Sequence, residues 1–116
     1  MQSEVHGLVS ERKIVLVAGV YDALSARLAE RAGFHSVVVT GYGVAAAFLG
    51  EPDFGLLTQT EIVETARRIC RAVKIPVVVD GDTGYGGALN VRRMVEELIS
   101  AGVENCHCFS PFAFSA

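Results

Sequence analysis

Short runs of branched apolar residues recur along the chain and predict buried strands. Three such runs occupy residues 14–18, 36–40 and 75–80, and a fourth is expected to begin near Val103. The runs are continuously apolar rather than alternating, which is typical of strands covered on both faces in a parallel sheet. The sequence therefore predicts four strands.

The segments between these runs carry apolar residues at helical spacing. Asp22 is in position to cap a helix over 23–32, and Gly33 is expected to end it. The apolar stripe of this helix consists of Leu24, Leu28 and Ala32. A long connection follows the second strand, and one short helical turn is expected in it, over 44–49.

The helix after this connection has the clearest start signal in the chain. Thr58 and Glu61 form a capping-box pattern at its beginning. Its apolar positions are Ile62, Val63, Ala66, Ile69, Cys70 and Val73. Asn90 is expected to cap a last helix, which Gly102 ends. The apolar stripe of that helix consists of Val91, Met94, Val95, Leu98 and Ile99.

The resulting order of elements is βαβαβαβ, which predicts a parallel sheet with right-handed helical crossovers. Two architectures have this order. One is a part of a (β/α)8 barrel, and the other is a small doubly wound open sheet. Periodicity alone does not distinguish between them, because both place a helix after each strand.

Composition narrows the class of protein. The chain has 116 residues, of which 51% are hydrophobic and 20% charged, so a single core-forming domain is expected. A net charge of -3 argues against a nucleic-acid surface, which needs clustered Lys and Arg. The polar residues 1–13 contain no apolar run of signal-peptide length, and no segment approaches the roughly 20 apolar residues of a membrane span. A cytoplasmic location is the expectation.

Three cysteines, Cys70, Cys106 and Cys108, make an odd number and indicate no disulfide framework. Cys106 and Cys108 are two residues apart, but the chain lacks the further ligands at the spacing that a zinc site requires. We interpret this pair as part of a tail without a metal.

Two carboxylates stand where the third strand ends, in the segment VVVDGDTGYGG. Asp80 and Asp82 are expected to point to the same face of the strand, at the edge where parallel sheets place their chemistry. Adjacent carboxylates repel, so a hard divalent cation such as Mg²⁺ is a natural partner. Alternatively, the two acids cap the next helix or bind backbone amides in the glycine-rich loop.

A family resemblance adds to this interpretation. DGDTGYGGALNVRR resembles the Asp-x-Asp-Thr-Gly-Tyr-Gly signature of the isocitrate lyase and phosphoenolpyruvate mutase superfamily. Upstream segments resemble the same family in the same order, namely AGVYDALSARLAERAGF, VVVTGYGVAAAFLGEPDFGLLT and ARRICRAVKIPVV. The similarity runs from about Val15 to Val103. The chain resembles the branch with methylisocitrate and dimethylmalate lyases, oxaloacetate decarboxylase-like enzymes, and phosphonopyruvate-processing and carboxyvinyl-carboxyphosphonate phosphorylmutase-like enzymes.

The resemblance implies a (β/α)8 barrel, Mg²⁺ as cofactor with Mn²⁺ as an alternative ion, and an oxo- or hydroxy-acid substrate. Asp80 would bind the metal directly and also face the substrate, whereas Asp82 and Asp53 would hold the metal through its waters. The substrate carboxylate would be received by Thr40, Gly41, Tyr42 and Gly43, with Tyr21 and Asp22 near the same pocket. The family also implies a homo-oligomer for a complete chain.

The match to the family ends at the fourth strand. Relatives continue with a His-Ile-Glu-Asp-Gln-like segment and then a gating loop with a catalytic cysteine. Here His107 aligns with the histidine, but no acidic residue follows it. We therefore expect a polar lead-in over 1–13, the amino-terminal three to four βα units of a barrel over 14–105, and a divergent tail over 106–116.

Several functions remain open at this point. The first is the amino-terminal part of a magnesium-dependent lyase that cleaves a carbon–carbon bond in a 2-hydroxy or 2-oxo dicarboxylic acid through an enolate, inactive as this chain alone. The second is the corresponding part of a phosphoenolpyruvate mutase or phosphonopyruvate-type enzyme. The third is a non-catalytic half-barrel. A small flavodoxin-like binding module is a fourth, weaker alternative.

Overall fold

The computed structural model describes residues 4–11 and 14–108 and is built on one parallel sheet. Its strands pair in sequence order, β1-β2-β3-β4. Their bounds are Val17–Val20, Ser36–Val39, Val77–Asp80 and Asn105–His107. Each neighbouring pair is parallel, so all four strands end at the same edge of the sheet.

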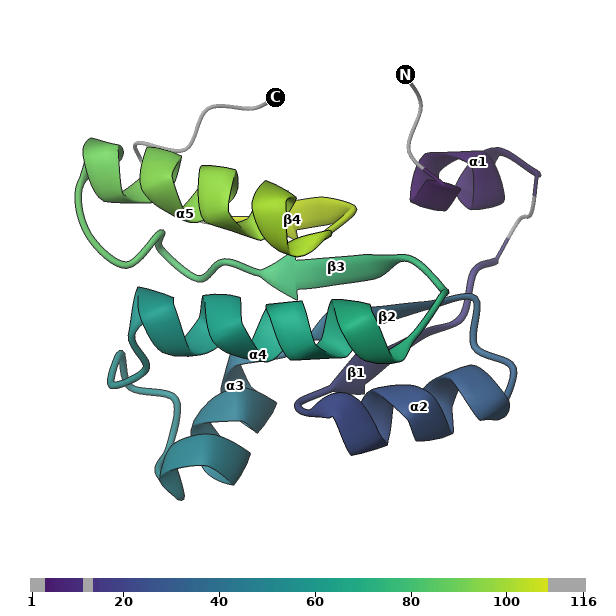
Figure 1. Cartoon of the computed structure of the whole chain (residues 1–116), viewed down its shortest axis with the longest axis horizontal. Coiled ribbons are helices and arrows are strands. Elements are labelled where there is room, and N and C mark those ends of the chain that lie inside the picture. The colour runs from purple at the N-terminus through teal and green to yellow at the C-terminus, as the bar shows by residue number, and fades with distance from the viewer. Residues whose placement is uncertain (1–3, 12–13, 109–116) are drawn as a thin grey trace.

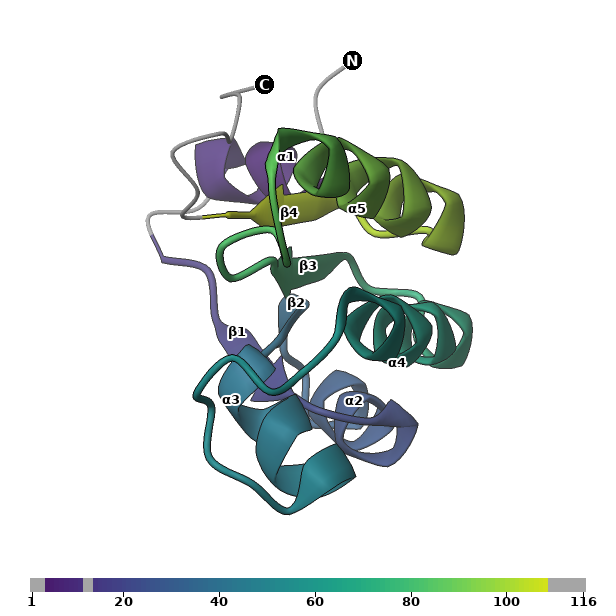
Figure 2. The same ribbon diagram turned by 90° about the vertical axis from the view of Figure 1, so that its left-hand side faces the viewer.

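Helices connect the strands and cover one face of the sheet. In chain order they are α1 (Glu4–Glu11), α2 (Ala23–Arg31), α3 (Gly41–Val44), η1 (Ala45–Leu49), α4 (Gln59–Ala72) and α5 (Ala88–Ala101). Figures 1 and 2 show α2, α4 and α5 side by side, all on the same side of the strands. Within the described ranges, each helix is too short or too polar to cross a lipid bilayer.

This arrangement distinguishes between the two architectures that the sequence left open. A doubly wound sheet has helices on both faces and a strand order that reverses at a switch point. Here the order never reverses, and α2, α4 and α5 share one face. Consecutive units of a (β/α)8 barrel have this geometry. The prediction of a partial barrel is confirmed.

The hydrophobic core lies between the sheet and the three covering helices. From the strands it contains Val20, Val37, Val39, Val77 and Val79; from α4 and α5 it contains Ile62, Val63, Ala66, Ile69, Met94 and Leu98. The predicted capping box of α4 is present, because Thr58 and Glu61 exchange side-chain and backbone hydrogen bonds. Asp22 caps α2 as predicted, in a capping box with Ser25.

The first strand lies later in the chain than expected. We predicted residues 14–18, but pairing begins at Val17. The amide of Leu16 donates to Nδ1 of His35, 3.4 Å away, instead of to a neighbouring strand. Within the expected lead-in, α1 was not predicted, although Val5, Leu8 and Val9 stand at helical spacing there.

The starts of two helices also differ from the prediction. We expected Asn90 to cap the last helix, but α5 begins at Ala88 and Gly87 is its N-cap. Gly87 enters the helix in extended backbone without a side-chain hydrogen bond, so the sequence offers no capping side chain there. Likewise, the helical turn expected over 44–49 begins earlier, at Gly41, because Thr40 caps α3.

The predicted apolar stripe of α2 does not face the core. Leu24 and Leu28 are 68% and 58% exposed, whereas Ala26 and Ala29 are buried against the sheet. Small residues occupy the core side because α2 lies close to β1 and β2. The two leucines are therefore exposed to solvent in the described part of the chain.

Candidate active site at the carboxyl edge of the sheet

The residues singled out from the sequence gather where β1, β2 and β3 end. Asp80 is the last residue of β3, and Gly41 begins α3 directly after β2. A methyl group added at Gly41 would lie 3.6 Å from Oδ2 of Asp80 and 3.8 Å from Oδ2 of Asp53. The two carboxylates, 27 positions apart in the sequence, therefore border the same small space beside a residue without a side chain.

Asp82 joins this cluster through a turn rather than through strand alternation. We expected Asp80 and Asp82 to share a face of one strand, but β3 ends at Asp80 and Asp82 has a left-handed backbone with φ 49°. Its amide donates a 3.0 Å hydrogen bond to Oδ1 of Asp80. The alternative in which these acids bind loop amides is thus observed for Asp80, and Asp82 likewise accepts from the amide of Thr83.

Repulsion from neighbouring carboxylates affects the pKa of Asp82. Burial raises the pKa of Asp82 above its usual range, and the charges of Asp53 and Asp80 raise that pKa further. The amide of Thr83 opposes this shift by donating a hydrogen bond to the carboxylate. The neighbouring charges thus disfavour the ionised form of Asp82, and a nearby cation would offset this effect.

The second predicted group forms the neighbouring part of the same edge. Oγ1 of Thr40 accepts a 3.4 Å hydrogen bond from the amide of Gly43. A methyl group at Gly43 would lie 2.7 Å from Cγ2 of Thr40 and 3.2 Å from Cβ of Tyr21, so only glycine fits there. Tyr42 is different, because its side chain is 69% exposed. The substrate-binding roles of these residues stay predictions.

The arrangement of Asp80, Asp82 and Asp53 indicates how these residues could bind a cation. Among the described residues, no three His, Cys, Asp or Glu side chains are grouped to hold a metal ion directly. The family resemblance, however, implies only one direct ligand, Asp80, with Asp82 and Asp53 acting through water. Within 4 Å, a methyl group added at Gly41 would meet only an oxygen of each of two carboxylates, and we expect such water on this side of Gly41. The residues fit a hydrated Mg²⁺, which keeps several of its waters.

The fourth strand closes one side of the cluster. His107 pairs with Asp80 in the strand register, and its carbonyl oxygen accepts a 2.6 Å hydrogen bond from the amide of Gly81. Beside it, burial raises the pKa of the Cys106 thiol to about 11, with smaller contributions from Cys108 and Asp80. A thiol with so high a pKa is a poor nucleophile at neutral pH. Residues 109–116, most of the predicted tail, lie outside the described residues.

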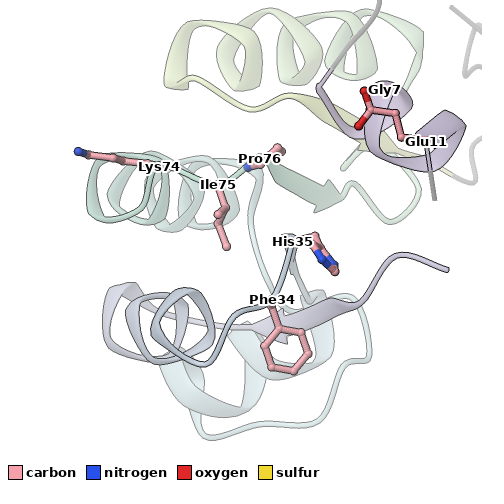
Figure 3. Close-up of a pocket in the computed structure, with 7 residues that line it drawn as sticks. All are labelled: Gly7, Glu11, Phe34, His35, Lys74, Ile75 and Pro76. Atoms are coloured by element: carbon pink, nitrogen blue, oxygen red, sulfur yellow. The ribbon is translucent and has the colours of Figure 1, made fainter.

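A hollow of about 520 Å³ lies at the opposite edge of the sheet, between α1 and the starts of β2 and β3. Its lining includes Glu11, His35 and Lys74 (Figure 3). Figure 3 shows the Lys74 side chain extending away from the other lining residues, so the charged groups do not converge on a common point. This hollow lacks the convergent polar groups of a binding site.

Tyr85 belongs to the candidate site but had no predicted role. Together with Asp82 it lines a second hollow, whose other wall is formed by residues 55–59. Burial raises the pKa of its hydroxyl far above the usual range, and the charges of Asp82, Asp80 and Asp53 add to this shift. The residue stood in the quoted signature, but its position beside the carboxylates depends on the fold of the loop.

Comparison with known proteins decides the family. The model of the phosphoenolpyruvate phosphomutase family matches residues 6–108. The chain belongs to this family. The petal death protein of Dianthus caryophyllus is 57% identical over 104 residues, which cover 89% of this chain and 33% of that protein. The 2,3-dimethylmalate lyase of Eubacterium barkeri is 46% identical over 101 residues, which cover 87% of this chain and 35% of the lyase.

The fold of the family is also found in solved structures. Phosphonopyruvate hydrolase in complex with oxalate and Mg²⁺ superposes with a TM-score of 0.79 at 33% identity, covering 85% of this chain and 34% of the hydrolase. The chain thus spans about a third of the length of the relatives it matches. Its relatives in the superfamily include lyases and mutases, and the sheet described above is a part of their barrel.

Proposed function

We propose that this chain is the amino-terminal part of a magnesium-dependent lyase that cleaves a carbon–carbon bond in a 2-hydroxy or 2-oxo dicarboxylic acid. The observation that carries the proposal is the space beside Gly41, which the carboxylates of Asp80 and Asp53 border from two different connections. The similarity to 2,3-dimethylmalate lyase supports the reaction class.

The residues at the carboxyl edge of the sheet would have two roles, binding the metal and orienting the substrate. Asp80 would hold Mg²⁺ directly, with Asp53 and Asp82 accepting hydrogen bonds from its waters. When bound, Mg²⁺ supplies stabilisation of the negative charge that develops on a substrate oxygen during bond cleavage. The turn from Thr40 to Gly43 would orient the substrate carboxylate through the amides of Gly41 and Tyr42, which begin α3 and have no partner within the helix. The amide of Gly43 already donates to Oγ1 of Thr40.

A second candidate function uses the same residues. Phosphonopyruvate hydrolase shares the fold and was solved with oxalate and Mg²⁺, so a phosphoenolpyruvate mutase or phosphonopyruvate-type activity is the alternative. In both reactions an oxygen of the oxo- or hydroxy-acid would lie next to the cation. A chain completed with the remaining barrel units of a relative distinguishes them when it is assayed on oxo- and hydroxy-diacids and on phosphonopyruvate.

Titration calorimetry with MgCl₂ tests the cation site itself. In the Gly41→Ala variant all three carboxylates remain, but the added methyl group occupies the space between Asp80 and Asp53 at ordinary contact distances. We expect Mg²⁺ affinity to fall about 10-fold or more, as is typical when the surroundings of a metal ligand are disturbed. Asp80→Ala should abolish binding.

Gly7→Ala in α1 is the matched control, because a methyl group there meets no other atom within 4 Å and lies far from the carboxylates. Its Mg²⁺ affinity should equal that of the wild type. Unchanged affinity in Asp80→Ala would remove this residue from the ligand set, and unchanged affinity in Gly41→Ala would show that the cation does not occupy the space beside it.

A further inference from the structure

The loop between β3 and α5 contains the two most unusual backbone conformations in the described part of the chain. Asp82 and Tyr85, with φ of 49° and 61°, are the non-glycine residues there with positive φ. Aspartate visits this left-handed region fairly often, whereas a bulky aromatic residue rarely does. The conformation of Tyr85 therefore costs conformational free energy that the rest of the structure must offset.

The residues next to Tyr85 indicate that its side chain contributes to the structure of the loop. Gly84 and Gly86 flank it, also at positive φ, and Gly87 follows. A glycine at position 85 would adopt the same backbone without strain. The tyrosine side chain must therefore provide something that a glycine lacks.

The contacts of Tyr85 indicate what that is. Its half-buried ring packs against the hydrophobic core beneath the sheet edge. Within residues 81–87, which read GDTGYGG, it is the residue with a large apolar body. Four of the other positions are glycine, so the loop has little else with which to hold a fixed position. The same ring forms a wall of the hollow that Asp82 lines.

We propose that Tyr85 is a positioning residue, whose ring anchors the glycine-rich loop to the hydrophobic core and thereby holds the Asp82 carboxylate beside Asp80 and Asp53. Only the consequence of this anchoring, tighter cation binding, depends on the proposed function. The anchoring itself is a property of the metal-free chain. The aromatic ring anchors the loop, and the hydroxyl group is not needed for this.

Amide hydrogen exchange tests the anchoring without any metal. The Asp82 amide is a direct reporter, since it donates to Oδ1 of Asp80. In Tyr85→Gly, which removes both the ring and the backbone strain, exchange at Asp82 should accelerate about 10-fold or more, while exchange at Ile69 in the core of α4 stays unchanged. Tyr85→Phe keeps the ring and should retain wild-type protection at both positions. If Tyr85→Gly fails to fold by circular dichroism, Tyr85→Asn replaces it with the same expectation, because asparagine tolerates the left-handed region.

Calorimetry with MgCl₂ then tests the consequence. Tyr85→Gly should weaken Mg²⁺ binding about 10-fold, and Tyr85→Phe should bind within about twofold of the wild type. Wild-type exchange at Asp82 in Tyr85→Gly overturns the anchoring role, and so does an equal loss of protection in Tyr85→Phe. A wild-type chain that binds no Mg²⁺ contradicts the proposed function, while the exchange data still decide the role of Tyr85.

Discussion

At the scale of single residues, small side chains decide how closely β3, β4 and the site loops approach one another. Gly81 follows the last residue of β3, and a methyl group there would lie 2.9 Å from Sγ of Cys106 and 2.9 Å from Cε of Met94. The His107 carbonyl oxygen would be 3.0 Å away and belongs to the backbone of β4. The glycine thus permits the hydrogen bond that closes β4 onto the candidate site.

We predict that Gly81→Ala lowers the free energy of unfolding by about 1–3 kcal/mol, because overpacking displaces neighbours that cannot all move. Urea denaturation measures the change. Gly19→Ala is the control: the added methyl group would lie 3.7 Å from Cγ2 of Thr40, an ordinary contact, and stability should stay the same or rise slightly. Equal stability of the two variants would contradict the close packing at Gly81.

At the scale of elements, α4 is the central helix of the covering layer. It packs against both α2 and α5, and its buried residues are apolar except Thr65, whose hydroxyl donates to the carbonyl oxygen of Glu61. Arg67 joins it to α5 through an ion pair with Glu97, and the side chain of Gln59 donates to the carbonyl oxygen of Asn90 at 2.8 Å. The start of α4 follows directly on the connection that carries Asp53, so the helix start and the candidate site are structurally linked.

We predict that Thr58→Ala lowers the free energy of unfolding by about 0.5–2 kcal/mol, since it removes the side-chain acceptor of the capping box. Thr60→Ala, at an exposed position two residues later in the same helix, should be neutral or slightly stabilising, because alanine has the higher helix propensity. Thermal denaturation followed by circular dichroism compares the two. A similar loss in both variants would mean that the cap contributes nothing specific.

At the scale of the whole molecule, the described residues form a barrel segment in which α2, α4 and α5 cover one sheet face and β1 and β4 are the edge strands. The outer helices expose apolar side chains four residues apart, Leu24 and Leu28 on α2 and Val95 and Ile99 on α5. Between them, α4 exposes no large apolar side chain. These flanks are where neighbouring helices pack in a complete barrel.

We predict that the 116-residue chain by itself does not turn over oxaloacetate, methylisocitrate or phosphonopyruvate in the presence of Mg²⁺. The three carboxylates lie near one another, but none of residues 108–116 is acidic. Asp53 is exposed and Asp80 and Asp82 are only partly buried, so water reaches them and weakens electrostatic stabilisation. Product formation followed by chromatography measures this, with the chain completed by a relative's remaining barrel units as the positive control. Robust magnesium-dependent turnover by the short chain would contradict the prediction.

The sequence by itself determined the order of the elements, the caps at Asp22 and Thr58, the helix end at Gly102, and the segments that carry the candidate acids. These features depend on neighbours within a few residues, which local periodicity and capping chemistry report directly. Only the tertiary structure decided that the three covering helices share one face, that the leucines of α2 point away from the core, and that Asp53 comes to the same space as Asp80. Periodicity tells which side of an element is apolar, but the partner on that side is set by strand pairing between residues far apart in the chain.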